Sequence, residues 1–348
     1  MKEAIVRKGT KVEIVDSPIP KAQKDQVVIK VEYSGSNPKD WKYPDITPKG
    51  EINIGDDIAG TIHEVGEGVS EFKVGDRVHA FHQMITPGGS FAEYAVAWSS
   101  TTAYLPPHVT YKEAAALPLA SLTSAVGLYD RLRLPQPWTP RKDDETPLPL
   151  VIYGASSAIG YYALQLALKS NIHPLICIAG NASAHVQKLL DASKGDVVID
   201  YRKGDDSVRK EIVSAIPSSA PLRHAFDGVS EKGSFQNIGA AMADQKSPGG
   251  GHITTVLPGR DFSDVPQGVN VSTTMVGDVH SSLKDFGYVY YRYVARGVDE
   301  GWFLPQPQVE IPGGLAGVQE GLTNLKEGKA SAVKYVFKIA DTPGIKGQ

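Results

Sequence analysis

Residues 151–160 constrain the fold more than any other part of this chain. They read Val-Ile-Tyr-Gly-Ala-Ser-Ser-Ala-Ile-Gly, so an apolar run typical of a buried strand ends at small residues. Behind that turn, apolar side chains recur at helical spacing at Ile159, Ala163 and Leu166. A strand that turns directly into a helix directs free backbone N–H groups and the positive end of the helix dipole at one point. The stretch therefore predicts an α/β fold with a site for a pyrophosphate group.

The turn also predicts which residues would contact a dinucleotide. Small side chains leave room for its close approach, and Ser156 or Ser157 can cap the exposed N–H groups. Ala155 and Ser157 stand where the G-x-G-x-x-G pattern has glycine, and an ordinary strand-to-helix turn is the alternative interpretation. Gly160 is expected where the helix packs closely on the strand. The predicted cofactor-binding residues here are Gly154, Ser156, Ser157, Ala158, Ile159 and Gly160.

The next apolar run, residues 174–179, bears on the choice of nicotinamide cofactor. An NAD site places an Asp or Glu about 20 residues after the glycine-rich turn, where it binds the ribose hydroxyls. No acidic residue lies between positions 171 and 185, which favours NADPH because a carboxylate would repel its 2′-phosphate. Ser183 follows this run and Tyr201 follows the next one, so both are predicted to contact the cofactor. For Tyr201 the alternative is a half-buried strand tyrosine.

Composition limits the class of protein. With 348 residues and 41% hydrophobic content, the chain can fill two domain cores. A net charge of −3 argues against nucleic acid or membrane as the main partner, and no apolar run approaches 18 residues. The chain opens on a strand pattern, so we expect a cytoplasmic protein. Its one cysteine, Cys177, excludes an intramolecular disulfide and a four-thiolate zinc lobe.

The pattern of the chain changes along its length. The first hundred residues contain short β-rich runs separated by Gly, Pro, Asn and Asp, which suggests a partly open barrel. Strands then alternate with helices over residues 151–276, which predicts a parallel sheet covered on both faces. Residues 303–337 return to short strands around one helix and are expected to fold back onto the first domain. The predicted domains are residues 1–125 with 293–348, and residues 126–292.

Five blocks in order carry a family resemblance. They are residues 36–42 (SNPKDWK), 55–60 (GDDIAG), 72–78 (FKVGDRV), 88–94 (GGSFAEY) and 115–118 (AALP). With the turn that follows them, the chain resembles the medium-chain dehydrogenase/reductase superfamily, in its zinc-free quinone oxidoreductase and enoyl reductase branch. Within that branch it looks most like fungal polyketide trans-acting enoyl reductases. The resemblance implies a GroES-like β-rich catalytic domain, a Rossmann-type doubly wound parallel sheet, and an active-site cleft between them.

The resemblance also makes a metal site testable residue by residue. Zinc-dependent relatives need a thiolate where this chain has Asn37 and a histidine where it has Asp56. An Asn–Asp pair does not supply the soft, nitrogen-rich ligands of catalytic zinc, so we expect no metal. His79 and His82 are the nearby metal candidates, and without a third ligand at suitable spacing they are interpreted as barrel or loop histidines.

Without a metal, conjugate reduction is the favoured reaction. Hydride arrives at the β-carbon of an α,β-unsaturated carbonyl, and the negative charge spreads to an enolate oxygen that a hydrogen-bond donor can stabilise. The resemblance implies Lys42, Thr123 and Asn37 as catalytic residues, and Leu257 and Pro258 in a loop facing the nicotinamide. The alternatives are a solvated lysine, a helix-capping hydroxyl and an Asx turn before a proline. Tyr43, Tyr94 or water could supply the α-proton.

The predicted function is therefore an NADPH-dependent enoyl or enone reductase. Its substrate would be a small-molecule or carrier-bound enoyl group, with a polyketide synthase as a possible partner. An NADPH quinone reductase and a non-catalytic NADPH-binding accessory protein are the alternatives. Relatives of this kind occur as monomers and as homodimers, and both remain open.

Overall fold

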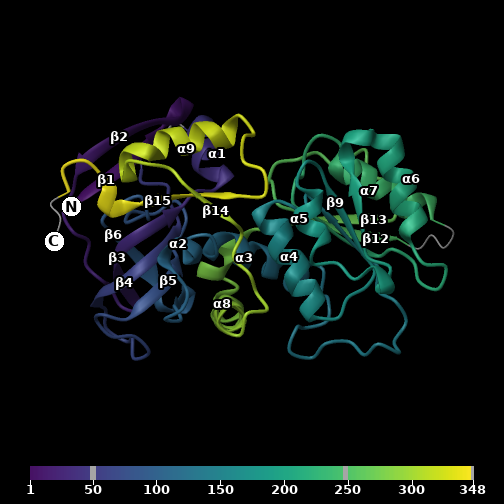
Figure 1. The fold of residues 1–348 in the computed structure, drawn as a ribbon, viewed down its shortest axis with the longest axis horizontal. Helices are drawn as coiled ribbons and strands as arrows, with labels where there is room; N and C mark the ends of the chain where they lie inside the picture. Colours follow the sequence, from purple (N-terminus) through teal and green to yellow (C-terminus); the bar gives the residue numbers. More distant parts are fainter. Residues whose placement is uncertain (48–51, 246–249, 346–348) are drawn as a thin grey trace. The chain divides into compact units, whose positions relative to one another are not determined.

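The computed structural model describes residues 1–47, 52–245 and 250–345 (Figure 1). Contacts between residues divide the chain into two units. One comprises Met1–Leu122 and Gly277–Gln348, and the other comprises Thr123–Val276. The β-rich unit and the parallel-sheet unit correspond to the two domain types expected, so the predicted fold class is confirmed.

The second unit is built on a parallel sheet. Among the described residues it has six strands in the order β10-β9-β8-β11-β12-β13. The strands are β8 (Leu150–Tyr153), β9 (Leu175–Ala179), β10 (Val197–Asp200), β11 (His224–Asp227), β12 (Gly251–Thr255) and β13 (Val269–Thr273). The chain runs outward from β8 in one direction and from β11 in the other, which makes the gap between them the switch point where ligands of such sheets bind.

The helices of this unit follow from the apolar runs between the strands. They are α4 (Ala158–Lys169), α5 (Ser183–Gln187), α6 (Asp205–Ala215) and α7 (Ser234–Asp244), with short turns η4 (Ala192–Lys194) and η5 (Tyr201–Lys203). Helix α4 is buried at every residue from Gly160 to Ala167, which explains why it is apolar on more than one face. The β8-turn-α4 arrangement matches the prediction for residues 151–160.

The first unit is mostly antiparallel. Over the described residues its main sheet has the order β14-β15-β3-β4-β5-β7, with β6 also paired to β3. The strands are β3 (Gln26–Gly35), β4 (Asp57–Val65), β5 (Arg77–Phe81), β6 (Tyr94–Trp98), β7 (Thr102–Tyr104), β14 (Gln308–Glu310) and β15 (Lys334–Lys338), beside the pair β1 (Lys2–Arg7) and β2 (Lys11–Asp16). Strand β15 pairs with β3, with Val336 opposite Gly35. The C-terminal segment therefore folds back onto the first domain, as predicted.

Five helices belong wholly or partly to this unit within the described residues. They are α1 (Pro38–Ile46), α2 (Tyr111–Ala114), α3 (Pro118–Ala125), α8 (Lys284–Asp299) and α9 (Val318–Lys326). Every helix in the described part of the chain is too short or too polar to cross a membrane.

The predicted domain boundary at residues 292/293 would cut helix α8 in two. The whole helix instead belongs to the first unit, where Tyr291 forms a 2.5 Å hydrogen bond with His79 and Arg292 forms a 2.5 Å ion pair with Glu71. The observed boundary lies before the helix, at Val276. These partners are about two hundred residues away in sequence, which is why the helix could not be assigned to its unit from pattern alone.

Candidate functional site

The predicted pyrophosphate turn lies at the carboxyl end of β8. Gly154 leaves the strand with φ of +77°, a conformation that other residues rarely adopt. Helix α4 then begins at Ala158, and the Ser157 hydroxyl caps it by accepting a 3.1 Å hydrogen bond from the Gly160 N–H. The remaining N–H groups of the first helical turn have no acceptor within the helix. The turn is therefore a place where an anion can be bound by backbone donors.

Two glycines of the turn are required by close contacts. A Cβ atom on Gly160 would overlap the Gly154 carbonyl oxygen, so helix and turn could not pack as they do. A Cβ on Gly154 would lie 2.8 Å from a methyl group of Val229. Gly154 and four other residues of the turn, Ser156, Ser157, Ala158 and Ile159, are partly exposed.

Other predicted cofactor residues lie at the same edge of the parallel sheet. Leu257 and Pro258 follow β12, where the Val256 N–H donates a 2.8 Å hydrogen bond to Ser230. Gly180 follows β9, and Ser183 opens α5 with its hydroxyl donating to the Gly180 carbonyl at 2.5 Å. Because the carboxyl ends of parallel strands share one edge, these segments lie along the edge that carries the turn.

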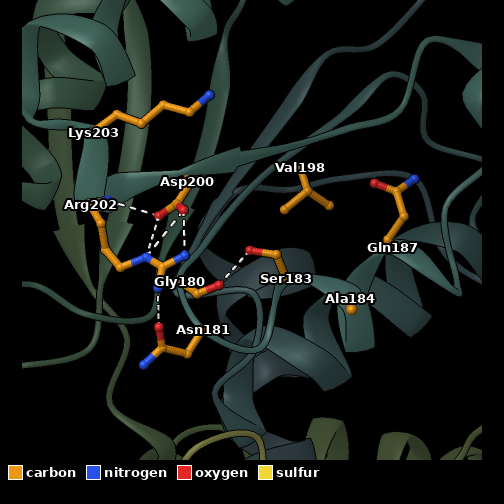
Figure 2. Close-up of a pocket in the computed structure, with 9 residues that line it drawn as sticks. All are labelled: Gly180, Asn181, Ser183, Ala184, Gln187, Val198, Asp200, Arg202 and Lys203. Carbon is orange, nitrogen blue, oxygen red and sulfur yellow. Dashed lines mark hydrogen bonds and ion pairs between the residues drawn. The ribbon is translucent and has the colours of Figure 1, made fainter.

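A pocket of about 380 Å³ lies at the ends of β9 and β10 (Figure 2). Its walls are Gly180, Asn181, Ser183, Ala184, Gln187, Val198, Asp200, Arg202 and Lys203. Tyr201 is half-exposed and does not line the pocket. Its ring instead packs so closely on Gly180 that a Cβ there would lie 2.6 Å from the ring. The predicted role of Ser183 at the cofactor is thus compatible with its position, and Tyr201 contacts the wall residue Gly180 without lining the pocket.

One ion pair dominates the charge of this pocket. Arg202 donates to both carboxylate oxygens of Asp200, at 2.9 Å from Nε and 2.6 Å from Nη2, and its Nη1 reaches the Asn181 side chain (Figure 2). The hydrogen bonds from Arg202 lower the pKa of Asp200 to about 2. The end of β9 carries no carboxylate, as the sequence indicates, but the neighbouring strand supplies one that Arg202 neutralises. Sequence reasoning missed Arg202 and Lys203, although an adjacent basic pair directly after an apolar strand was a usable signal.

The first unit holds a second group of functional candidates at the start of α1. Asn37 is the N-cap residue of that helix and is buried, and its backbone N–H donates to Asp40 at 2.7 Å. Its side-chain amide donates to Asp57 at 2.8 Å and accepts from the Lys334 ammonium at 2.7 Å. Both ends of the predicted catalytic amide are therefore engaged within the protein.

Lys39 is the centre of the neighbouring ion pairs. Its ammonium lies 2.8 Å from Asp40 and 2.6 Å from Asp56, and it donates to the Ile54 carbonyl. Burial raises the pKa of each of the two carboxyls to about 7, although Lys39 opposes that shift. Burial would lower the pKa of Lys39, but the two carboxylates outweigh it and raise the value. One ammonium thus faces two buried carboxyl groups.

Asp57 joins this group to helix α3. One of its oxygens accepts from the Leu119 N–H at 2.7 Å, and the other lies 2.6 Å from Lys334. Asp57 is fully buried and the Lys334 side chain is 5% exposed, so the pair is removed from water. We call Asn37, Lys39, Asp40, Asp56, Asp57 and Lys334 the buried charge network. Sequence reasoning used Asp56 only as a substitute for a zinc ligand, and it had no signal for Lys334, almost three hundred residues from Asn37.

The other two predicted catalytic residues lie outside the buried charge network. Lys42 is half-buried on α1, with its ammonium 5.5 Å from the centre of the Trp41 ring. Thr123 is buried on α3, one helical turn after Leu119. The next residue, Ser124, donates to the Ile159 carbonyl at 2.7 Å, which ties the end of α3 to the first turn of α4.

The two candidate metal histidines have other partners. Burial lowers the pKa of His79 to about 3, and its Nδ1 is hydrogen-bonded to Tyr291. The ring nitrogens of His82 contact the carbonyl oxygens of Val96 and Thr86 at 2.7 and 3.1 Å. In the described part of the chain, no three His, Cys, Asp or Glu side chains are grouped so that they could hold a metal ion.

Comparisons with known proteins agree with this fold. Residues 23–107 match the alcohol dehydrogenase GroES-like domain. An alcohol dehydrogenase superfamily protein from Novosphingobium aromaticivorans superposes with a TM-score of 0.77 at 20% identity, over 97% of this chain and 99% of its own. The quinone oxidoreductase from Coxiella burnetii gives a TM-score of 0.75 at 22% identity, over 97% and 99% of the two chains. These similarities show that the chain has the alcohol-dehydrogenase-type fold.

A sequence relative narrows the class to a family. The trans-enoyl reductase fsr4 of Gibberella fujikuroi is 52% identical over 318 residues, which are 91% of this chain and 92% of fsr4. The chain belongs to the trans-enoyl reductase family. The predicted resemblance to enoyl reductases of the medium-chain dehydrogenase/reductase type is confirmed, and membership in this superfamily of oxidoreductases implies a nicotinamide cofactor.

Proposed function

We propose that this protein is an NADPH-dependent enoyl reductase that acts without zinc on an α,β-unsaturated acyl group. The observation that carries the proposal is its 52% identity with a trans-enoyl reductase over nine-tenths of the chain. The substrate class is an enoyl thioester on the carrier of a polyketide synthase, from which the enzyme is separate. We place the protein in the cytoplasm.

The turn after β8 fits the pyrophosphate of such a cofactor. Gly160 has no side chain, so helix α4 packs closely on the turn at this point. Ser157 accepts from one N–H of the first helical turn, and the other N–H groups of that turn have no acceptor within the helix and can bind an anion. Residues 154 and 156–160 would hold the two phosphates, and Leu257 and Pro258 would face the nicotinamide. When bound, NADPH supplies the hydride that the β-carbon receives.

The pocket beside β10 supports the choice of NADPH. Arg202 and Lys203 bring two cations to it, against the single carboxylate of Asp200. The Arg202–Asp200 ion pair holds the guanidinium against the pocket wall and cancels most of the repulsion that Asp200 would exert on a 2′-phosphate. Ser183 and Asn181 add polar atoms to the same wall. NADH is the competing cofactor, because an unpaired Asp200 could instead accept hydrogen bonds from ribose hydroxyls.

Enoyl reduction requires that the negative charge on the enolate oxygen be stabilised. We propose catalytic roles for Thr123 and for Lys42, since a hydroxyl and an ammonium can each stabilise an oxyanion. Asn37 supports them through its amide, which the buried charge network already orients. An ammonium 2.6 Å from Asp56 competes with any cation at that carboxylate, and an amide replaces a thiolate at Asn37. These donors do not fit catalytic zinc.

A deuterium-transfer assay tests the reaction. The enzyme is incubated with crotonyl-pantetheine and NADPH deuterated at C4, and we expect a saturated thioester with deuterium on its β-carbon. Consumption of NADPH with a quinone and not with the thioester would favour a quinone reductase. Binding of NADPH with no consumption in either assay would favour an accessory protein, and both results contradict the proposal.

Arg202→Ala tests the cofactor choice. The variant loses a charge-assisted contact worth roughly 1.5–3 kcal/mol, so we expect KM for NADPH to rise about tenfold to a hundredfold. KM for NADH should stay within about twofold, because Arg202 would meet only the 2′-phosphate. Arg209→Ala is the matched control, since Arg209 is an exposed arginine of the same unit paired with Asp206. Equal changes for both cofactors, or a preference of the wild type for NADH, would show that Asp200 binds ribose and that NADPH is the wrong assignment.

A further inference from the structure

We propose that Lys334 is a positioning residue that acts through Asp57 on the Asn37 amide and on the start of helix α3. The inference rests on the proposed function, because it assigns the residue a part in enoyl reduction. Lys334 begins strand β15 near the end of the chain, and nothing in its sequence surroundings marks it as functional.

Hydrogen-bond chemistry at this point allows one arrangement of the amide. The Lys334 ammonium can only donate, and the Asp57 carboxylate can only accept. Asn37 lies between them, 2.7 Å from Lys334 and 2.8 Å from Asp57. Its oxygen must therefore face Lys334 and its NH₂ group must face Asp57. The two charged residues fix which end of the Asn37 amide is the donor. A reversed amide would place its NH₂ group against Lys334 and its oxygen against Asp57, and neither pair could form a hydrogen bond.

The same pair fixes the beginning of α3. Pro118 has no N–H, so Leu119 provides the first backbone donor of this helix, and Asp57 accepts from it at 2.7 Å. The other oxygen of Asp57 lies 2.6 Å from Lys334. One carboxylate thus connects the ammonium of β15 to the first turn of α3, which carries Thr123 one turn later on the same side of the helix.

The number of charged groups in the buried charge network shows why Lys334 is needed beside Asp57. The buried charge network contains three carboxyl groups and two ammonium groups, and Lys39 lies between Asp40 and Asp56. Within the buried charge network, Lys334 is therefore the cation that faces Asp57. Without it, Asp57 would be a buried carboxylate with no adjacent positive charge, which is unfavourable unless the group moves or takes up a proton. Either response would change the hydrogen bonds to Asn37 and Leu119.

The experiment compares four variants by turnover and by melting temperature. Lys334→Met should lower kcat with crotonyl-pantetheine about tenfold, as expected for a small displacement of catalytic groups, and should leave KM for NADPH within about twofold. Lys334→Arg keeps a donor-only cation and should recover most of kcat. Lys338→Met is the matched control, because Lys338 lies on the same strand in an exposed pair with Asp341 and should behave like the wild type.

The double variant K334M/D57N separates positioning from stability. Two neutral groups should restore the melting temperature, because the amide introduced by D57N can still accept from the Leu119 N–H. The NH₂ group of that new amide would then face Asn37, whose own amide must turn over. We therefore expect a stable protein whose kcat stays about tenfold low. Recovery of kcat together with the melting temperature would show a purely structural role and would overturn the inference.

Hydrogen exchange gives a readout that does not depend on activity. Amides of residues 119–125 should exchange faster in Lys334→Met than in the wild type or in Lys338→Met, because the start of α3 has lost its fixed acceptor. Unchanged exchange with unchanged kcat would overturn the inference. A wild type that fails to reduce the thioester would refute the proposed function, and exchange at α3 would still decide whether Lys334 holds that helix. If the Met variants do not fold, Lys334→Arg with near-normal kcat and exchange supports the inference, and loss of both contradicts it.

Discussion

The cofactor turn and the buried charge network are built on opposite principles. At the turn between β8 and α4, the useful groups are backbone N–H donors, and the side chains are small so that nothing fills the space in front of them. In the buried charge network, the useful groups are five charged side chains paired over distances of 2.6–2.8 Å, and all of them are buried except Lys39, whose side chain is 22% exposed. The turn depends on the absence of side-chain atoms in front of its N–H groups. The buried charge network depends on the presence of every charged group.

This difference predicts how each region responds to substitution. A turn made of backbone fails when an atom is added, because there is no space for a Cβ at Gly160 or Gly154. A network of buried charges fails when an atom is removed, since the partner left behind keeps its desolvation cost. Each region is therefore tested by the smallest change that it should not tolerate.

The largest effect is expected for Asp57→Ala. The change leaves the buried Lys334 ammonium without its counter-charge and removes the acceptor for Leu119 and Asn37. Breaking a buried ion pair from one side typically costs about 3–5 kcal/mol, so the free energy of unfolding measured in urea should fall by that amount. Asp341→Ala is the control, because its exposed pair with Lys338 should contribute less than about 1 kcal/mol. Equal losses in the two variants would mean that burial gives the network no special sensitivity.

The same contrast explains what the sequence could predict. The turn was predictable because strand, small residues, capping serine and helix are contiguous over residues 151–160, and each has a local physical signature. Asn37 was found because it lies in a recognisable block. Its partners Asp57 and Lys334 are 20 and 297 residues away, and a buried lysine looks like a surface lysine until the fold brings a carboxylate to it.

Helix α8 and Arg202 show the two intermediate cases. Helix α8 was not predicted from the sequence, and its membership in the first unit depends on His79 and Glu71, which are distant in sequence. Arg202 directly follows Tyr201 in the sequence, but its role at the pocket becomes apparent only from its ion pair with Asp200. In both cases the residues are visible in the sequence, and the contacts that define their role are not.

A smaller effect is expected for Gly160→Ala in the cofactor turn. The added Cβ would overlap the Gly154 carbonyl oxygen and lie 2.8 Å from Ala155 Cα, so backbone atoms must move apart. Overpacking of this kind costs about 1–3 kcal/mol, and the shifted turn should also bind NADPH more weakly in a fluorescence titration. Gly277→Ala is the matched control, since its Cβ would meet only the terminal methyl of Met84, which can rotate away. If both alanines were tolerated equally, the turn would not depend on the space that Gly160 leaves.

The pH dependence of stability also separates the two regions, because the buried charge network contains ionisable side chains and residues 154–160 of the turn contain none. Burial raises the pKa of Asp40 and of Asp56 from 3.8 to about 7, against the attraction of the shared Lys39. The folded protein therefore keeps a proton that the unfolded chain has released once the pH exceeds about 4. A carboxyl with a raised pKa stabilises the folded state fully below pH 3.8, and that contribution is lost as the pH rises through about 7.

Asp56→Asn should remove this dependence, because Lys39 would then face Asp40 alone and the pair would be neutral without an extra proton. For one shared proton, the wild type should lose stability relative to Asp56→Asn by up to about 1.4 kcal/mol per pH unit between pH 4.5 and 7. The difference between the two curves of stability against pH isolates this term, since carboxyl groups away from the Asp40–Asp56 pair titrate alike in both proteins. Asp16→Asn serves as the control, because Asp16 forms an exposed pair with Lys2. Parallel curves for wild type and Asp56→Asn would mean that both carboxyl groups are ionised beside Lys39, and the buried charge network would then carry a net negative charge without holding a proton.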